Sequence, residues 1–308
     1  MPTLQQFRYL VAVAETLHFR KAAESVHVTQ PTLSTQLREL EEKLGVQLVE
    51  RSRSGVTLTA VGSQVAARAR GVLRDVADIA ALARSGSDPL AATVRVGVVG
   101  SLGSYFLPLV IPALHARFPD LKFYVREGTA TDLLGRLRDG TLDLLFFPTP
   151  VEGADLHVEP LFHEPLLVVL PVDHPLSAHD VVDRAALRGE TVMTLEAGHR
   201  LHDTVAALCE ETGARLSLDY EGTSLDTLRQ MVATGLALSV LPALYVRSEV
   251  AREALVTARP LSDPAPGRDI GIVSRKTAAQ RAAFGRLAAT IRDTLAATAP
   301  EVRVIDPD

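Results

Sequence analysis

Residues 19–42 read FRKAAESVHVTQPTLSTQLRELEE, and this stretch predicts two short helices joined by a tight break. Apolar residues recur at helical spacing from Phe19 to Val26, which is typical of a short amphipathic helix. Thr29 is a favourable N-cap for a second helix. Pro31 falls in the first turn of that helix, where a missing N–H costs no hydrogen bond. The stretch therefore predicts a helix-turn-helix.

Short polar side chains and one guanidinium occupy the outer side of the second helix, which we expect to run to about Leu44 with leucines on its core side. Glutamine pairs with an adenine edge or a phosphate, hydroxyls suit phosphates, and arginine suits guanine or phosphate. Proline shapes the helix start and can touch a thymine methyl group. We expect a recognition helix in a DNA major groove, and the alternative is a solvated polar face. The predicted contacts are Gln30, Pro31, Thr32, Ser34, Thr35 and Arg38.

Two short β-prone runs follow, on either side of a polar turn that carries Arg51 and Arg53. A hairpin with cations at its tip is a wing that would hold the DNA backbone or the minor groove. Residues 1–58 therefore predict a winged helix-turn-helix domain that binds double-stranded DNA. The alternative for this segment is a small helical domain with a solvated turn.

Residues 59–85 predict a long linker helix without proline. Its apolar residues recur in alternating steps of four and three, the pattern of a coiled coil: Val65, Ala69, Val72, Val76, Ile79 and Ala83. A two-fold dimer paired through this helix would present two recognition helices to a pseudo-palindromic operator. The alternative is a helix packed on its own domain.

Beyond a hinge-like Ser-Gly-Ser-Asp-Pro run, residues 86–308 alternate between strands and helices, which predicts an α/β regulatory domain with parallel sheets. We expect two Rossmann-like lobes, similar to those of periplasmic binding proteins. Lobe I covers about 91–163 and 269–300, and lobe II about 164–268, with Leu166–Leu170 as its first strand. Two lobes with a cleft between them suit a receptor for a small effector molecule.

The totals fit such a protein without indicating DNA binding by themselves. The 308 residues are 47% hydrophobic and 22% charged, and the net charge is −5. The first 90 residues carry 11 basic and 9 acidic side chains, against 21 and 28 in the remainder. We find no apolar run long enough to span a bilayer and no signal-peptide pattern, so we expect a cytoplasmic protein without a membrane partner. Cys209 is the single cysteine, so no disulfide can form within one chain.

Enzyme motifs are weak. The glycines around Ser101 lack the spacings of a nucleophile elbow and of a dinucleotide loop. His199 and His202 with Asp203 could approach a metal, but this spacing is common by chance. We therefore expect no enzyme activity, no cofactor and no metal. The alternative from another class is a solute-binding α/β protein or an enzyme with an incidental helical domain.

Candidate effector-binding residues lie where strands give way to helices, because backbone N–H groups point outward there. A positive helix end together with Arg200 favours a small anion such as a carboxylate. The alternative is that Arg200 points to solvent or pairs with Asp203 or Glu196. The candidates are Ser101, Thr129 and Thr131 in the first lobe, and His199, Arg200 and Asp203 in the second.

The chain resembles the LysR-type transcriptional regulators over essentially its whole length. The resemblance is carried by LQQFRYLVAVAET, by FRKAAESVHVTQPTLSTQLRELEEKLGVQLVER, and by the weaker segments LTAVG, VRVGVVGSLGSYFLP, DGTLDLL and LPVDHPL. It implies a homodimer through the linker helix that assembles into a homotetramer. It also implies an effector-dependent change in DNA bending and contact with RNA polymerase.

Within that family, LEAGHRLHDTVAALCEETGA resembles the peroxide-responsive OxyR branch. In that branch a peroxidatic cysteine follows the histidine of Gly-His, and a resolving cysteine lies nine residues further on. Arg200 occupies the first position and Cys209 the second, while the branch's peroxide-holding threonine falls on Ala130. Arginine supplies no thiolate, so the disulfide switch is missing. Cys209 stays a redox candidate as a one-cysteine peroxide sensor, and the alternative is a buried, inert thiol.

Overall fold

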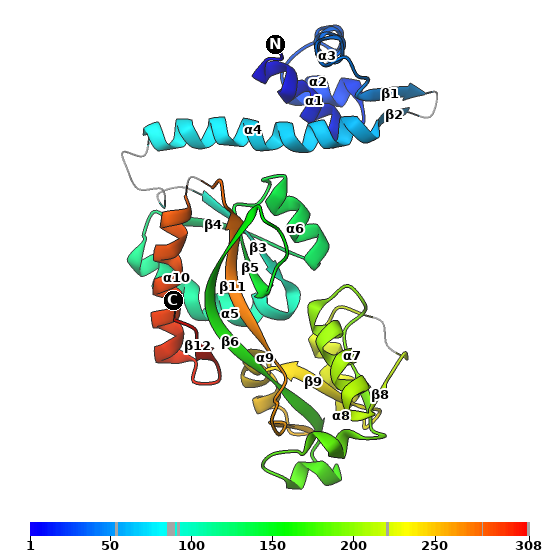
Figure 1. Cartoon of the computed structure of the whole chain (residues 1–308), viewed down its shortest axis with the longest axis vertical. Helices are drawn as coiled ribbons and strands as arrows, with labels where there is room; N and C mark the ends of the chain where they lie inside the picture. Colours follow the sequence, from blue (N-terminus) through cyan, green and yellow to red (C-terminus); the bar gives the residue numbers. More distant parts are fainter. Residues whose placement is uncertain (53–54, 85–89, 91–92, 220–221, 279, 307–308) are drawn as a thin grey trace. The chain divides into compact units, whose positions relative to one another are not determined.

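The computed structural model describes residues 1–306 except 53–54, 85–89, 91–92, 220–221 and 279. It divides into two compact units whose boundary lies between residues 88 and 89. The N-terminal unit holds the predicted helix-turn-helix and wing (Figure 1). Its elements are α1 (Leu4–Thr16), α2 (Phe19–Ser25), α3 (Gln30–Leu44), the antiparallel pair β1 (Val49–Ser52) and β2 (Gly55–Leu58), and α4 (Ala60–Arg84).

The start and end of α3 follow from its sequence. The Thr29 side chain accepts a hydrogen bond from the N–H of Thr32, as an N-cap should. Gly45 ends the helix in the left-handed conformation, with φ of 70°. Leu33, Leu37 and Leu40 are buried on the core side as predicted, whereas Leu44 is 37% exposed because it lies in the last turn, beyond the domain core.

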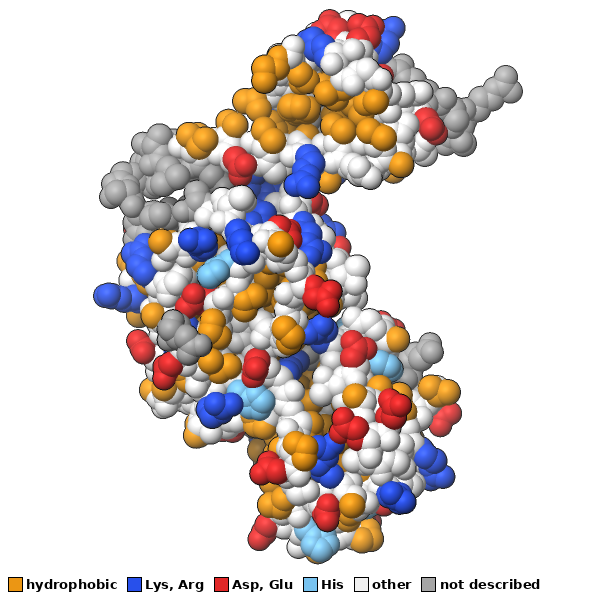
Figure 2. All heavy atoms as spheres, in the orientation of Figure 1, with side chains coloured by type: hydrophobic (Ala, Val, Ile, Leu, Met, Phe, Trp, Pro, Cys, Tyr) orange, Lys and Arg blue, Asp and Glu red, His pale blue; other side chains and the backbone are white. Residues whose placement is uncertain are grey.

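The helix α4 has two different halves. Ala66 and Ala69 are buried, and this part of α4 packs against α1. Further along, Val72, Val76 and Ile79 are 43%, 41% and 66% exposed. Figure 2 shows further hydrophobic side chains, in orange, on the visible face of the N-terminal unit. The predicted apolar row thus begins inside the unit's own core and continues on its surface.

The second unit contains two α/β lobes. In lobe I the strands β3 (Thr93–Val99), β4 (Lys122–Gly128) and β5 (Leu144–Thr149) are parallel, as predicted. They are joined by α5 (Gly100–Arg117) and α6 (Ala130–Arg138), and α10 (Arg281–Thr298) packs against α5. Lobe II contains β7 (Thr191–Met193), α7 (Arg200–Thr212), β8 (Arg215–Leu216), α8 (Leu225–Ala233), β9 (Leu238–Pro242), α9 (Ala243–Ser248) and β10 (Val256–Arg259).

Two long strands, of which β6 pairs in both lobes, correct the sequence prediction. The strand β6 covers Leu156–Pro171, although only Leu166–Leu170 was expected to be a strand. It pairs antiparallel with β11 (Gly267–Arg275), and in lobe II also with β9 and β10. The sheet order is β4-β3-β5-β11-β6-β9-β7-β8, and β12 (Arg303–Val304) also pairs with β6. The sheet is therefore mixed rather than parallel.

Each lobe has its own hydrophobic core. One buried cluster gathers β3, β5, α5 and α10, and the other gathers β6, β7, α7, α8 and β9. Tyr105 packs against both clusters, so it lies where the lobes meet. No helix among the described residues is long and apolar enough to cross a membrane.

Candidate functional site

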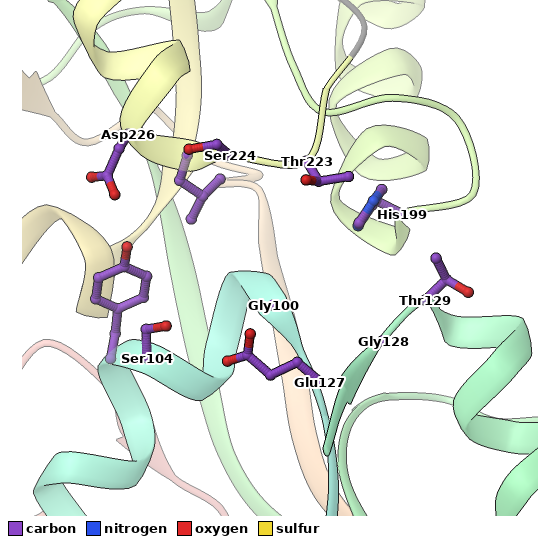
Figure 3. Close-up of a pocket in the computed structure, with 11 residues that line it drawn as sticks. Gly100, Ser104, Glu127, Gly128, Thr129, His199, Thr223, Ser224 and Asp226 are labelled. Atoms are coloured by element: carbon purple, nitrogen blue, oxygen red, sulfur yellow. The ribbon is translucent and has the colours of Figure 1, made fainter. Parts of the chain in front are cut away.

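A cavity of about 440 Å³ lies between the two lobes of the second unit (Figure 3). Cavities of this size hold small molecules in many proteins. Residues from both lobes line it: Gly100, Ser104, Tyr105, Glu127, Gly128 and Thr129 from lobe I, and His199, Thr223, Ser224, Leu225 and Asp226 from lobe II. No cluster of histidine, cysteine or carboxylate side chains that could hold a metal occurs in the described part of the chain.

Four helices begin at this cavity. Gly100 is the first residue of α5, and Thr129, His199 and Ser224 directly precede α6, α7 and α8. Thr129 Oγ1 accepts a hydrogen bond from the N–H of Asp132, and Ser224 Oγ accepts one from the N–H of Thr227. Within the described residues, the N-cap residues of α5 and α7, Val99 and His199, make no side-chain cap hydrogen bond, so the first N–H groups of these helices lack that acceptor.

Ser101 does not line the cavity, contrary to the sequence prediction. It is 7% exposed, and its Oγ and carbonyl oxygen accept hydrogen bonds of 2.8 and 2.9 Å from the Arg268 guanidinium. Arg268 is paired with Glu164, which is fully buried and also accepts a hydrogen bond from the N–H of Leu244. Ser101 is therefore part of a buried polar network that fixes the start of α5 against the two long strands.

Arg200 also lies outside the cavity. Its side chain is exposed, and Nη2 donates a 2.8 Å hydrogen bond to the carbonyl oxygen of Pro150. The alternative in which Arg200 points to solvent agrees with this exposure, and no ion pair with Asp203 or Glu196 is seen among the described residues. Because Pro150 follows β5 and Arg200 begins α7, the hydrogen bond joins lobe I to lobe II. The Arg200 guanidinium is therefore not part of the cavity lining.

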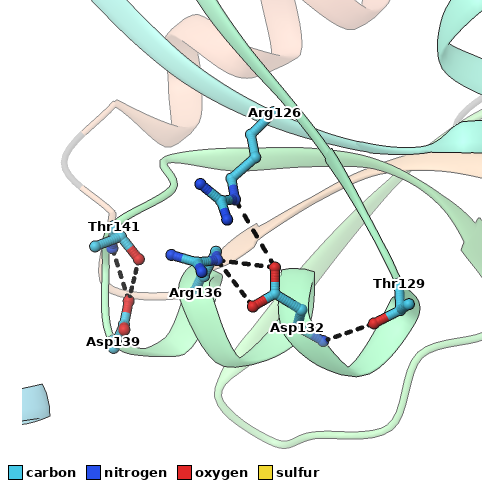
Figure 4. Close-up of polar contacts among 6 residues, drawn as sticks. All are labelled: Arg126, Thr129, Asp132, Arg136, Asp139 and Thr141. Carbon is cyan, nitrogen blue, oxygen red and sulfur yellow. Dashed lines mark hydrogen bonds and ion pairs between the residues drawn. The ribbon is translucent and has the colours of Figure 1, made fainter.

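The two predicted threonines differ in position. Thr129 lines the cavity, while Thr131 is exposed and lies outside its lining. Behind Thr129, Asp132 forms an ion pair of 2.8 Å with Arg136 and lies 3.8 Å from Arg126, as Figure 4 shows. These contacts hold the first turn of α6 in place and leave the Thr129 side chain at the rim of the site.

Of the three lobe II candidates, only His199 lines the cavity. Its Nε2 atom is buried without a hydrogen-bond partner among the described residues, and it lies 3.8 Å from Glu196 Oε1. Asp203 is exposed on α7 and does not reach the cavity lining. His202 is held by the carbonyl oxygen of Leu195 through Nδ1, at 2.8 Å.

Sequence reasoning missed the aromatic and acidic lining. Tyr105 packs edge-on against Tyr245, with ring centroids 5.0 Å apart, and Tyr245 donates a 3.0 Å hydrogen bond to Asp226. Burial, with smaller effects from Asp226 and other nearby carboxylates, raises the pKa of Tyr105 to about 12. Glu127 stands at the end of β4, and Asp226 in the first turn of α8. The sequence signal that could have identified these two lining residues is a carboxylate at the end of a strand or at the start of a helix.

Cys209 is 3% exposed on the core side of α7. Burial raises the pKa of its thiol, which disfavours the thiolate needed for attack on peroxide. The interpretation as a buried thiol therefore fits its environment better than the one-cysteine sensor does.

The predicted DNA-contacting residues lie on one side of α3. Gln30, Pro31, Thr32, Thr35 and Arg38 are exposed and Ser34 is half-buried, while the leucines of the helix face the core. Thr32 Oγ1 lies 2.8 Å from Thr29 Oγ1, so the hydroxyl groups at the helix start support one another. Arg53 and the side chain of Arg51 lie outside the described residues.

Comparisons with known proteins agree with both units. The model of the "LysR substrate binding domain" matches residues 87–296, and that of the "bacterial regulatory helix-turn-helix protein, lysR family" matches residues 4–63. The chain is 40% identical over 289 residues to the DNA-binding transcriptional dual regulator OxyR of Escherichia coli, which covers 94% of each chain. A full-length OxyR variant from Pseudomonas aeruginosa superposes with a TM-score of 0.82 at 36% identity, over 99% of this chain and 98% of that one. A hydrogen-peroxide-bound OxyR variant from Corynebacterium glutamicum gives a TM-score of 0.66 at 29% identity, over 96% and 94%.

Proposed function

The chain belongs to the LysR family of bacterial DNA-binding transcription regulators, and we propose that it works as an effector-controlled dimer on a pseudo-palindromic operator. A small molecule in the cavity between the lobes changes the arrangement of the two DNA-binding units. That change alters DNA bending and the recruitment of RNA polymerase. The proposal rests on the observation that one chain combines an exposed recognition helix with a cavity lined by residues of both lobes.

The recognition helix α3 makes the base and phosphate contacts in this proposal. Exposed amide, hydroxyl and guanidinium groups on one helix side are the chemical groups that read a major groove. Arg38 is the cation among them, and its Nε donates to the carbonyl oxygen of Ser34 at 3.4 Å. That contact leaves the rest of the guanidinium for a guanine edge or a phosphate.

The dimer forms through α4 in this proposal. Val72, Val76 and Ile79 are exposed at steps of four and three, so they form a row that a second copy of the helix can cover. Assembly of two dimers into a tetramer follows the resemblance to the family. The boundaries that we propose are 1–58 for the DNA-binding domain, 59–85 for the linker helix and 86–308 for the regulatory domain.

We propose a cavity ligand rather than thiol oxidation as the signal. One of the structures named above is an OxyR variant bound to hydrogen peroxide, and in the OxyR branch two cysteines form the switch. Cys209 is the single cysteine here and is buried, and Arg200 donates to Pro150 at the other cysteine position of that resemblance. Without a second thiol, peroxide cannot close a disulfide within one chain.

A gel-shift and footprinting experiment on the DNA upstream of the protein's own gene tests the proposal. Arg38→Ala should weaken binding roughly 10- to 100-fold, the usual effect of one good base or phosphate contact. Lys122→Ala removes the same charge from an exposed position in the regulatory domain and serves as the matched control. Equal binding by wild type and Arg38→Ala would remove α3 from the interface, and no binding by wild type would refute the DNA-binding proposal.

A further inference from the structure

The cavity between the lobes has an acidic lining contributed from both sides. Glu127 at the end of β4 belongs to lobe I, and Asp226 in the first turn of α8 belongs to lobe II. Figure 3 shows both side chains among the residues that line the cavity. Among the described residues that line it there is no lysine or arginine, and His199 is the single basic side chain of that set. Two carboxylates of opposite lobes therefore share one cavity.

Neither carboxylate has a basic partner in the described part of the chain. Asp226 accepts a hydrogen bond from Tyr245, while the neighbouring Arg229 forms its ion pair with Glu253 instead. The Glu127 side chain takes part in no ion pair or hydrogen bond among the described residues, while its backbone belongs to the β3–β4 pairing. Its Oε1 atom lies close to Gly103, where an added Cβ would stand only 2.7 Å from it. Both groups thus keep their acceptor capacity for a ligand.

The opposite end of the cavity has a different chemistry. The helix α7 begins there without a side-chain cap, and the Nε2 atom of His199, the residue before α7, is buried without a hydrogen-bond partner among the described residues. A helix start with free N–H groups attracts an oxygen atom that carries negative charge or a lone pair. The cavity therefore offers acceptors at one end and donors at the other.

We infer that the cavity binds a small molecule that carries a primary amine. Its ammonium group lies between Glu127 and Asp226, and an oxygen atom at its other end, from a carboxylate or hydroxyl, lies at the start of α7. The inference rests on the proposed function, because it names the chemical class of the effector of that same cavity. An anion without an amine is disfavoured, since it would stand beside two carboxylates without a compensating cation.

The placement of the carboxylates also explains how such a ligand closes the cleft. In the absence of a ligand, two like charges on opposite lobes repel each other. An ammonium group between them replaces this repulsion with two attractions, one to each lobe, and so favours the closed arrangement. Tyr105 also lines this cavity, and its phenol can accept or donate a hydrogen bond there.

Titration calorimetry on the full chain with matched pairs of probes tests the inference. L-alanine and L-lactate share a carboxylate and differ in the ammonium group, and ethanolamine and ethylene glycol differ in the same way without a carboxylate. The smallest probe is methylammonium chloride. Its effect on the thermal unfolding of the protein is compared with that of sodium chloride at equal ionic strength. We expect the amine of each pair to bind or stabilise the protein, and its partner to have no effect.

Variants locate the effect. Glu127→Gln and Asp226→Asn keep the shape and most hydrogen-bonding capacity, and each should weaken amine binding about tenfold or more, as loss of one charged contact does. Asp203→Asn makes the same change on an exposed residue outside the cavity and should leave the titration unchanged. Amine probes that do no better than their partners overturn the inference, as do amine responses that survive both cavity variants. Gel shifts on the same preparations separate this failure from failure of the proposed function, because DNA binding does not depend on the class of ligand.

Discussion

Arg268 carries the positive charge of the buried ion pair at the lobe junction. Removing this charge should cost more stability than removing any other single charge among the described residues. In Arg268→Met the side chain keeps much of its volume but loses the three hydrogen bonds that the guanidinium donates to Glu164 and Ser101, together with the ion pair to Glu164. Glu164, which is 0% exposed, would then keep only the N–H of Leu244. An uncompensated buried charge typically costs about 3–5 kcal/mol.

Thermal unfolding followed by circular dichroism measures this cost. For a domain of about this size each kcal/mol lowers Tm by about 2–4 °C, so Arg268→Met should unfold roughly 6–20 °C below wild type. The double variant Glu164→Gln with Arg268→Met removes the stranded charge and should recover part of the loss. The matched control is Arg247→Met, which breaks an ion pair with Glu301 whose side chains are 38% and 32% exposed. Such a pair contributes less than about 1 kcal/mol.

Two results would refute this reasoning. A loss for Arg268→Met as small as that of Arg247→Met would mean that the buried pair contributes no more than a surface pair. A double variant no more stable than Arg268→Met alone would mean that the stranded Glu164 charge is not the source of the cost. In either case the start of α5 would owe its position to packing rather than to the contacts of Ser101 with Arg268.

Three further predictions concern the cavity and its surroundings. In an alkaline titration Tyr105 and Tyr245 should ionise above the ordinary tyrosine pKa near 10, because burial raises the pKa of both. The stability that Tyr105 contributes is complete below pH 10 and is lost as pH rises towards 12. Tyr105→Phe should remove one late-ionising phenol, and an unchanged phenolate titration in this variant would contradict the prediction. Cys209 should react with a thiol reagent far more slowly in the native protein than in denaturant, and equal rates would place it on the surface. Calorimetry with a panel of carboxylates should give the same curves for wild type and Arg200→Ala, because the guanidinium contacts Pro150 outside the cavity lining, and a lost titration would return Arg200 to the site.

The helix-turn-helix could be predicted closely because its signals are local. The cap at Thr29, the proline that follows it and the spacing of Leu33, Leu37 and Leu40 all lie within one short segment, and tertiary packing agrees with them. The same holds for the linker helix, predicted over residues 59–85 and observed as α4 over Ala60–Arg84. Propensity and packing point to one answer in these elements.

The strand β6 could not be read in the same way. Pro160 and Pro165 lie within it, and proline normally argues against a central strand. The segment forms a strand because β11, about a hundred residues later, pairs with it along most of its length. A pairing between segments so distant leaves no trace in local spacing.

The site was only half predictable for a related reason. The expectation that helix starts surround the cavity was correct for Thr129 and His199, since strand-to-helix transitions are visible in the sequence. Which side chain at a helix start turns inward depends on distant partners. Arg268 holds Ser101, and the carbonyl group of Pro150 holds Arg200.

The two long strands β6 and β11 also constrain the order of events during synthesis. In the sheet of lobe I, β11 lies between β5 and β6, so its place stays empty until residues 267–275 have left the ribosome. Translation proceeds at about 5–20 residues per second, and the N-terminal unit can fold during that interval while lobe I still lacks an interior strand. A nascent or prematurely terminated chain would thus present a finished DNA-binding unit with an unfinished receptor. A DNA-binding product that cannot respond to its signal is the specific hazard of this topology, and its β5 would keep an unpaired edge where β11 belongs.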